Sequence, residues 1–338
     1  MKSIFKLIIV ITFFVGCKNN NHKKPSTIII ETTSYPTIGY LEKKDNSFYN
    51  HVPQSTKIEV IADGYVWTEG PVWITDEQCL LFSDVPQNIN YKWTEEKGAV
   101  QFLNPSGYTG KDKKLQGSNG MFLDQENNLI LCQTGDRVVA RYLGDYKNPV
   151  SEFEVIASEF EGKKFNAPND LVIDKKGNIY FTDPNFGLEE GSKELEFEGV
   201  YMIGTNREVK LLTSKWPTPN GIGLSPDGSK LYIANSNPPL FVSYDISEGG
   251  HLTNEKIVLD LQEALDKSIS KQKPDGMAIK KDGTIFLTGP DGVFVINKNG
   301  NHLGTIKTDK LTSNCVFNED ESVLYVSCHE LILRIKLN

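Results

Sequence analysis

Six oxygen-bearing side chains recur along the chain, each at the start of a short apolar run. The intervals between them are 50, 50, 51, 55 and 39 residues. Two are carboxylates and four are amides, and such hard oxygen ligands suit Ca²⁺, Mg²⁺ or Mn²⁺. Asn and Asp also open strands as turn-forming residues, which is the alternative explanation for any single member. The six residues are Glu69, Asn119, Asn169, Asn220, Asp275 and Asn314.

Each of these residues begins the same two-part pattern. A short apolar run is followed by a polar turn and by a second run rich in β-branched and aromatic residues, as in NGMFLDQENNLILCQT from Asn119. This pattern predicts a β-hairpin. A unit of about 50 residues leaves room for two more strands, and the runs 199–204 and 209–214 supply them in one unit. The sequence therefore predicts an all-β fold, a six-bladed β-propeller with four-stranded blades.

The last unit is too short for a complete blade. It ends with the apolar run 331–337, and the run 58–62 lies just before the first unit. We expect this N-terminal strand to complete the last blade and close the ring, which removes exposed sheet edges. The propeller then spans residues 57–338, with a short helix expected only at 262–269. The first strand of every blade lines the channel of a propeller, so the six oxygen-bearing residues should converge at one mouth.

The N-terminus has the composition of an export signal. Residues 1–17 combine a lysine-containing start, a short apolar run and a Gly-Cys boundary, and the run is too short to span a bilayer. The boundary resembles a bacterial lipobox, which predicts lipidation of Cys17, with plain secretion as the alternative. Residues 18–56 are expected to form a tether and lead-in segment. We thus expect an exported lipoprotein, anchored to a membrane and facing the periplasm.

Overall composition excludes several classes of protein. The 338 residues include 36 basic and 44 acidic side chains, for a formal net charge of −8, which disfavours nucleic acid and anionic membrane surfaces as partners. No apolar stretch approaches the length of about 20 residues that a membrane-spanning helix needs. Apart from Cys17, the cysteines form no metal motif, and they are buried thiols or include one disulfide such as Cys315–Cys328. The other two are Cys79 and Cys132.

The hairpin segments resemble the senescence marker protein/gluconolactonase (regucalcin-like) family of six-bladed propellers. The resemblance covers roughly residues 58–337, and the matching motifs occur in the family's order. These motifs are TEGPVW (68–73), SNGMFLD (118–124), FNAPNDLVIDKKGNIYFTDP (165–184), PNGIGLSPDGSKLYIANS (219–236) and PDGMAIKKDGTIFLTGPDGVFV (274–295).

The resemblance implies one divalent metal ion. Family members hold it with a Glu in the EGPVW-type motif, an Asn in the NG motif and an Asp in the PDGM motif, which correspond to Glu69, Asn220 and Asp275. Asn169, in the PND motif, is implied as a fourth ligand or a substrate contact. The implied ion is Ca²⁺ first, with Zn²⁺, Mg²⁺ and Mn²⁺ as alternatives.

The resemblance also implies residues that bind the substrate. Asn119 and Asn169 are expected to contact substrate hydroxyls, and Asp170 either joins them in the pocket or supports the turn. Two positions depart from the family: Thr134-Gly135 stands where many bacterial members have His-Gly, and Ala167 where animal members have Arg. Arg137 either restores a cation near the first of these positions or is a surface residue. These departures leave the substrate less defined than the metal.

The implied activity is hydrolysis of a sugar lactone, a small-molecule ester. A bound cation would polarise the carbonyl and lower the pKa of a water molecule, and Asp275 would be both a ligand and the general base. One alternative keeps the site for phosphotriesterase-like hydrolysis. The other is a non-catalytic propeller that binds a sugar or a partner and whose metal is structural, because propellers host many functions.

Overall fold

The computed structural model describes residues 7–10, 29–32, 35–111 and 116–337. Cys17 and most of the predicted signal segment lie outside these residues, so lipidation stays a prediction. Within the described ranges, no helix is long and apolar enough to cross a membrane.

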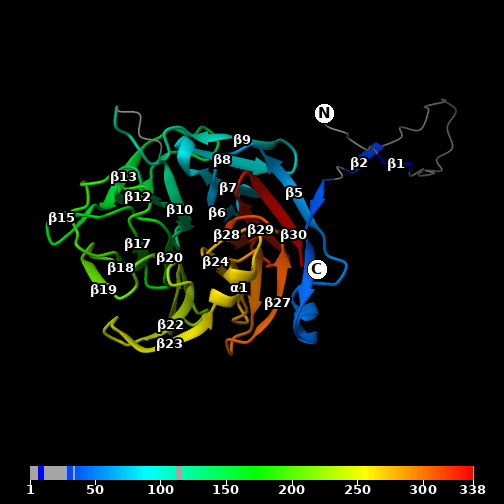
Figure 1. Cartoon of the computed structure of the whole chain (residues 1–338). Helices are drawn as coiled ribbons and strands as arrows, with labels where there is room; N and C mark the ends of the chain where they lie inside the picture. Colours follow the sequence, from blue (N-terminus) through cyan, green and yellow to red (C-terminus); the bar gives the residue numbers. More distant parts are fainter. Residues whose placement is uncertain (1–6, 11–28, 33–34, 112–115, 338) are drawn as a thin grey trace.

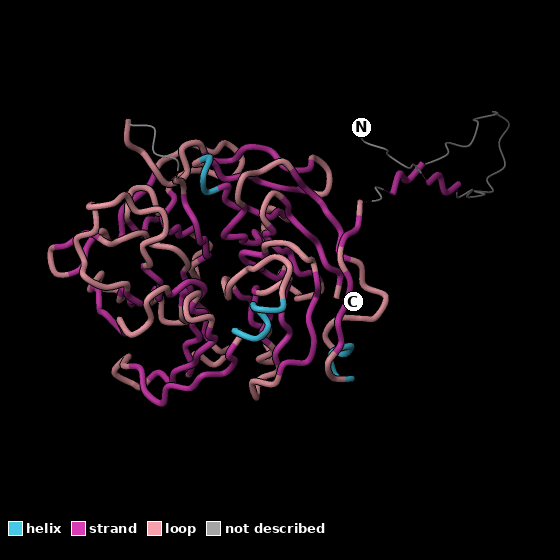
Figure 2. The backbone as a smooth tube through the Cα atoms, in the orientation of Figure 1, coloured by secondary structure: helices cyan, strands magenta, loops and turns pink. Residues whose placement is uncertain are grey.

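The described chain forms a ring of six antiparallel sheets, and each sheet is one blade (Figure 1). Strands and their connecting loops account for nearly all of the ring, with very little helix (Figure 2). The first four blades each contain four strands in chain order. They are β6 (Thr68–Ile74), β7 (Cys79–Asp84), β8 (Ile89–Thr94) and β9 (Gly98–Leu103); β10 (Ser118–Leu123), β11 (Leu129–Gln133), β12 (Val138–Tyr142) and β13 (Phe153–Ala157); β16 (Leu171–Ile173), β17 (Ile179–Asp183), β18 (Gly199–Ile203) and β19 (Val209–Thr213); and β20 (Pro219–Leu224), β21 (Lys230–Asn235), β22 (Leu240–Ile246) and β23 (Leu252–Asp260).

The last two blades have five strands each, because strands from the N-terminal part of the chain extend them. The fifth blade has the order β24-β25-β26-β27-β4, and the sixth has the order β28-β29-β30-β5-β3. Their strands are β24 (Met277–Ile279), β25 (Ile285–Gly289), β26 (Gly292–Ile296), β27 (His302–Lys307) and β4 (Tyr40–Lys43), then β28 (Thr312–Phe317), β29 (Val323–Cys328), β30 (Leu331–Lys336), β5 (Ile58–Asp63) and β3 (Thr37–Ile38).

Few elements lie outside the blades. The α-helix falls within the predicted 262–269 segment, and two short 3₁₀ helices and two short strand pairs are also described. These elements are α1 (Gln262–Lys267), η1 (Asn46–Asn50), η2 (Val85–Gln87), β1 (Leu7–Val10) with β2 (Ile29–Thr32), and β14 (Glu159–Phe160) with β15 (Lys163–Lys164).

The ring closes through β5, as the sequence predicted. This strand pairs antiparallel with β30, and the register sets Ile58 opposite Ile335 and Asp63 opposite Leu331. The preceding segment adds two strands that the prediction did not include: β3 pairs with β5, and β4 pairs with β27. The later part of the lead-in segment is therefore attached to the outer edges of two neighbouring blades.

Polar contacts reinforce the junction between the first and last blades. The hydroxyl of Thr68 donates to the carbonyl oxygen of Leu331 at 3.0 Å and also accepts from the backbone N–H of Cys328. On the outer side, Arg334 is only 7% exposed and pairs with Glu59 at 2.7 Å and with Glu95. These contacts join β5 and β6 to β29 and β30, which lie at the other end of the sequence, so closure does not depend on backbone pairing alone.

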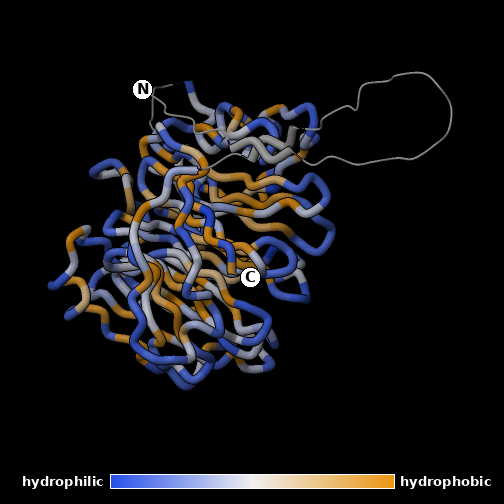
Figure 3. The backbone as a smooth tube through the Cα atoms, turned by 90° about the vertical axis from the view of Figure 1, so that its right-hand side faces the viewer, coloured by the Kyte–Doolittle hydropathy of each residue, from blue (hydrophilic) through white to orange (hydrophobic). Residues whose placement is uncertain are grey.

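The hydrophobic core lies between neighbouring blades. Hydrophobic residues lie along the strand segments of the backbone, and hydrophilic residues gather in the outer turns (Figure 3). One apolar cluster joins the fifth and sixth blades and includes Phe286, Val326 and the fully buried Phe48 of η1. The four cysteines of the described residues are buried and free of disulfides, so the thiol alternative holds for Cys79, Cys132, Cys315 and Cys328.

Replacing Phe48 with Ala should destabilise the whole propeller, because this ring is fully buried between two blades. A buried Phe→Ala change costs about 3–5 kcal/mol through lost burial and the cavity that remains. Urea unfolding should show this loss in the free energy of unfolding. The control is Tyr40→Ala, which truncates a 54% exposed ring in β4 and should change stability by less than about 0.5 kcal/mol. Equal effects would show that η1 is not part of the core.

Candidate active site

Five of the six predicted oxygen-bearing residues line one cavity of about 440 Å³ at a mouth of the channel. The sixth, Asn314, does not line it. The other walls include aromatic and polar residues from the loops around the mouth, among them Trp67, Gln116 and Phe186. The five converging residues are Glu69, Asn119, Asn169, Asn220 and Asp275.

The first strands approach one another closely enough that glycine is needed beside the site residues. Gly70 has φ +48°, and an added Cβ would lie 1.9 Å from the carbonyl oxygen of Asn119. At Gly276 an added Cβ would lie 2.1 Å from the side chain of Asn314. No side chain fits at such distances, so the Glu-Gly and Asp-Gly dipeptides let neighbouring blades bring their first residues together.

A repeated hydrogen-bonding pattern holds the loops that lead into the first strands. The side chain of the last residue in a blade's second strand accepts hydrogen bonds from backbone N–H groups. These N–H groups belong to the loop that precedes the first strand of the same blade. Asp84 accepts from Val66 and Trp67, both at 3.1 Å. Asp183 accepts from Asn166 and Ala167, both at 2.8 Å, and Asn235 accepts from Thr218 at 3.1 Å. These loops lead directly to Glu69, Asn169 and Asn220, so the hydrogen bonds help to fix the positions of these site residues.

The amide side chains form a chain of hydrogen bonds around the cavity. Asn119 donates from Nδ2 to Oδ1 of Asn169 at 2.5 Å, and Asn169 donates in turn to Oδ1 of Asn220 at 2.5 Å. Asn220 then donates to Oγ of Ser236 at 3.1 Å, and this hydroxyl donates to the carbonyl oxygen of Pro274. The chain links four blades and ends beside Asp275. It orients each amide, and every amide oxygen keeps a second lone pair.

Two buried carboxylates face this amide chain without a cationic partner in the described residues. Glu69 is 4% exposed, and burial and then the charge of Asp170 raise its pKa to about 8. Burial, Glu69 and Asp170 raise the pKa of Asp275 well above its ordinary value. A buried carboxylate without a cation favours the protonated form, because charge is poorly solvated there. The site therefore favours bound protons or a cation.

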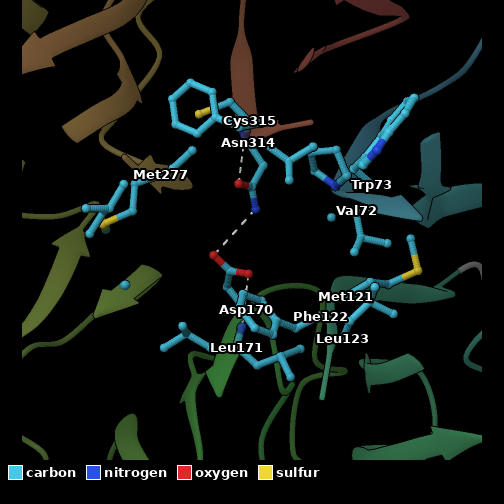
Figure 4. A pocket seen from close by; sticks show the side chains of 18 of the residues that line it. Val72, Trp73, Met121, Phe122, Leu123, Asp170, Leu171, Met277, Asn314 and Cys315 are labelled. Atoms are coloured by element: carbon cyan, nitrogen blue, oxygen red, sulfur yellow. Dashed lines mark hydrogen bonds between the residues drawn. The ribbon is translucent and has the colours of Figure 1, made fainter. Parts of the chain in front are cut away.

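Asp170 and Asn314 lie on the other side of this acid cluster. Both line a second cavity, which follows the later residues of the same first strands (Figure 4). Asn314 donates to Oδ2 of Asp170 at 3.4 Å, and burial raises the pKa of Asp170 to about 7. The predicted substrate contact of Asp170 stays a prediction, and the structure gives Asp170 no place on the wall of the first cavity. Asn169 and Asp170 lie directly before β16, where the backbone of both pairs with Thr182, and of the two only Asn169 lines the first cavity.

The donor set of the first cavity fits a divalent cation. Glu69 and Asp275 supply two carboxylates, and Asn169 and Asn220 supply two amide oxygens, all of which are hard donors. A divalent charge would offset the two buried carboxylates that have no ion pair. Within the described residues, no group of three or more His, Cys, Asp and Glu could hold a metal by itself.

Sequence reasoning missed two residues that hold the carboxylates. Gln272 is 7% exposed, and its Nε2 donates to Oδ2 of Asp275 at 3.0 Å. The indole Nε1 of Trp67 donates to Oε1 of Glu69 at 3.3 Å. Trp67 stands directly before the TEGPVW motif, so its proximity to Glu69 was visible in the sequence. Gln272 belongs to an irregular loop, and no periodic pattern pointed to it.

The two departures from the family pattern have different outcomes. Thr134 lines the first cavity and donates to the carbonyl oxygen of Pro168 at 2.8 Å. Ala167 is 1% exposed and lines a neighbouring cavity instead. Arg137 donates to the carbonyl oxygens of Phe165 and Ser192 and does not line the first cavity. Its guanidinium links loops of the second and third blades by these hydrogen bonds. A substrate in the first cavity would therefore not contact Arg137 directly.

The fold and the site together define a six-bladed β-propeller with a ring of acids and amides at one channel mouth. A family model described as SMP-30/Gluconolactonase/LRE-like region matches residues 67–330. The chain belongs to this family, which confirms the resemblance seen in the sequence. It is 35% identical over 315 residues to a gluconolactonase of Zymomonas mobilis, with 89% of this chain and 86% of that relative covered. Regucalcin of Oryctolagus cuniculus is 25% identical, with 81% and 87% covered.

Solved structures agree on the architecture. A putative gluconolactonase superimposes with a TM-score of 0.78 at 26% identity, covering 88% of this chain and 98% of that one. A gluconolactonase from Xanthomonas campestris gives the same TM-score at 22% identity, covering 90% and 98%. The second likeness supports the fold alone. The prediction of a six-bladed propeller closed by an N-terminal strand is confirmed.

The raised pKa values predict how stability depends on pH when a chelator is present. Glu69 and Asp170 have pKa values of about 8 and about 7 in the folded protein, against ordinary values of 4.5 and 3.8. The folded protein therefore binds more protons than the unfolded chain between these values, and stability falls as pH rises. Thermal unfolding should give a lower Tm at pH 8 than at pH 5.5.

The variant Asp170→Asn should make this dependence on pH shallower, because it removes one of the groups. Asp227→Asn is the control, since the pKa of this exposed acid is lowered to about 2 and it stays ionised throughout the range. A Tm that rises or stays constant from pH 5.5 to pH 8 would contradict the assignment.

Proposed function

We propose that the protein hydrolyses a sugar lactone and needs one divalent ion, with calcium as the first candidate. The observation that carries the proposal is the convergence of Glu69, Asn169, Asn220 and Asp275 on one cavity. Family membership and the gluconolactonase relatives support the reaction class. The structures and sequences of regucalcins, one of which is described as calcium-binding, support a divalent ion in this fold. When bound, such an ion would polarise the lactone carbonyl.

In this proposal, Asp275 takes a proton from the attacking water. Its carboxylate lines the cavity, and Gln272 fixes one of its oxygens. A general base must be ionised, so the positive charge that offsets Glu69 and Asp275 also keeps Asp275 able to accept a proton. Glu69 is held by Trp67 and by the N–H of Gly70 at 3.2 Å. Its role is to bind the ion, and it has no part in proton transfer.

The amide chain provides specificity. Asn119 and Asn169 are oriented by their mutual hydrogen bond and can bind hydroxyl groups of the sugar ring. Trp67 and Phe186 give the mouth two aromatic surfaces, which suit the apolar face of a sugar ring. The cavity of about 440 Å³ lies within the ordinary range for a small-molecule site.

Substitution of the two carboxylates should separate proton transfer from ion binding. Asp275→Asn keeps size and one oxygen but cannot accept a proton near neutral pH, so kcat should fall by about 10²–10⁴-fold. Glu69→Gln leaves the proposed base intact and should mainly weaken calcium binding. A pH-indicator assay with gluconolactone, titrated with calcium after chelation, should show that excess calcium rescues Glu69→Gln substantially and Asp275→Asn hardly at all.

The control for this experiment is Glu208→Gln, an exposed substitution outside the cavity that should leave turnover unchanged. Equal rescue of both variants would assign Asp275 to ion binding only. Unchanged turnover in both variants would reject the site. Calcium binding without turnover of any lactone would favour the alternative of a non-catalytic binding protein. Turnover of an aryl phosphotriester alone would favour the alternative of a phosphotriesterase.

We also propose that the protein is exported and anchored through Cys17. The support is the lysine-containing start, the short apolar run and the Gly-Cys boundary of residues 1–17. Mass spectrometry of the mature protein from membranes should find Cys17 as the N-terminal residue with a diacylglyceryl group. Cys17→Ser should release the protein from the membrane fraction. An unmodified N-terminus at another residue would contradict the proposal.

A further inference from the structure

The second cavity has a character opposite to that of the first. It measures about 370 Å³ and is bordered by the later residues of the first strands, on the far side of Asp170 and Asn314 from the candidate active site. Apolar side chains make most of its wall (Figure 4). They include Val72, Trp73, Met121, Phe122, Leu171 and Met277.

Asp170 and Asn314 form the polar end of this cavity. They come from the third and sixth blades, which lie opposite each other in the ring, and their side chains point toward one another (Figure 4). Asn314 donates to Oδ2 of Asp170 at 3.4 Å, and the backbone N–H of Leu171 donates to Oδ1 at 3.0 Å. Asp170 is 8% exposed, and all of these partners are neutral. A buried carboxylate with neutral partners alone is best matched by a cationic ligand.

The charged side chains that line the cavity are all acidic. Its acidic lining residues are Asp170, Glu319 and Glu321, and no Lys, Arg or His of the described chain lines it. Lys280 lies 5.5 Å from the ring of Phe317, outside the lining. Such a potential attracts cations and repels anions.

The walls decide which kind of cation fits. A calcium ion takes six to eight oxygen ligands, whereas the side chains around the polar end provide only one carboxylate and one amide. The rest of the surface would instead gain from contact with an apolar body, which removes apolar area from water. The volume is sufficient for a small organic molecule.

We propose that this second cavity is a binding site for a small organic ammonium ion with an aromatic or branched apolar body. The ammonium group pairs with Asp170, and the apolar body packs against Phe122, Met121 and Trp73. The site is separate from the candidate active site, and its occupation does not depend on lactone hydrolysis.

The direct test is isothermal titration calorimetry with three probes of similar shape. Saturating calcium is present throughout, so that the carboxylates of the first cavity are offset by the ion and do not attract the ammonium probe. These probes are 2-phenylethylammonium, 2-phenylethanol and 3-phenylpropionate. The ammonium should bind at least tenfold more tightly than the alcohol, and the carboxylate should give no binding. Equal affinity for the ammonium and the alcohol, or binding of the carboxylate, would overturn the proposal.

Two substitutions locate the bound ammonium. Asp170→Asn should reduce its affinity to that of the alcohol. Thr75 lines the cavity and is half-buried, so Thr75→Arg adds bulk and positive charge and should weaken binding at least tenfold even if Asp170→Asn fails to fold. Thr253→Arg, an exposed change on the outer strand β23, is the matched control and should bind as the wild type does. Unchanged binding in Thr75→Arg, or loss of binding in Glu69→Gln alone, would place the ligand elsewhere and reject the proposal.

Discussion

The structure depends on three carboxylates that are buried at the axis of a closed ring. Glu69, Asp170 and Asp275 interact electrostatically, and burial raises the pKa of each. Buried negative charges of this kind persist only when protons or cations offset them. The closed ring enforces their proximity, because every blade contributes its first strand to the same channel. An ion at this position would therefore compensate charge, order the acids and keep Asp275 ionised.

The same constraint divides the channel into two halves of different chemistry. On one side, amides and two carboxylates line a cavity suited to an ion and a hydroxylated ring. On the other, a mostly apolar wall surrounds the pair of Asp170 and Asn314, and Glu319 and Glu321 also line the cavity. The division follows the direction of the first strands, since residues at their start line the first cavity and later residues line the second. Asn169 faces one cavity and Asp170 the other, although they are neighbours in the sequence.

The repeated pattern was enough to predict the six blades, the closing strand and the five residues that share the first cavity, because each recurs in phase. It could not separate Asn314 from the other five, since that depends on how the last blade packs against the side chain of Asp170 across the channel. The added strands β3 and β4 were also missed, because their sequence resembles a polar lead-in and they are fixed only by pairing with distant strands. Gln272 acts from an irregular loop that carries no periodic signal.

We propose that the buried acids and amides of the first cavity hold one divalent ion. The most direct measurement is a crystal structure of the calcium-loaded protein at pH 8, with the ion identified by its anomalous scattering. We expect a single ion at the channel mouth, with side-chain oxygens of Glu69, Asn169, Asn220 and Asp275 within about 2.3–2.6 Å. An empty cavity in saturating calcium, or an ion held by other residues, would contradict it.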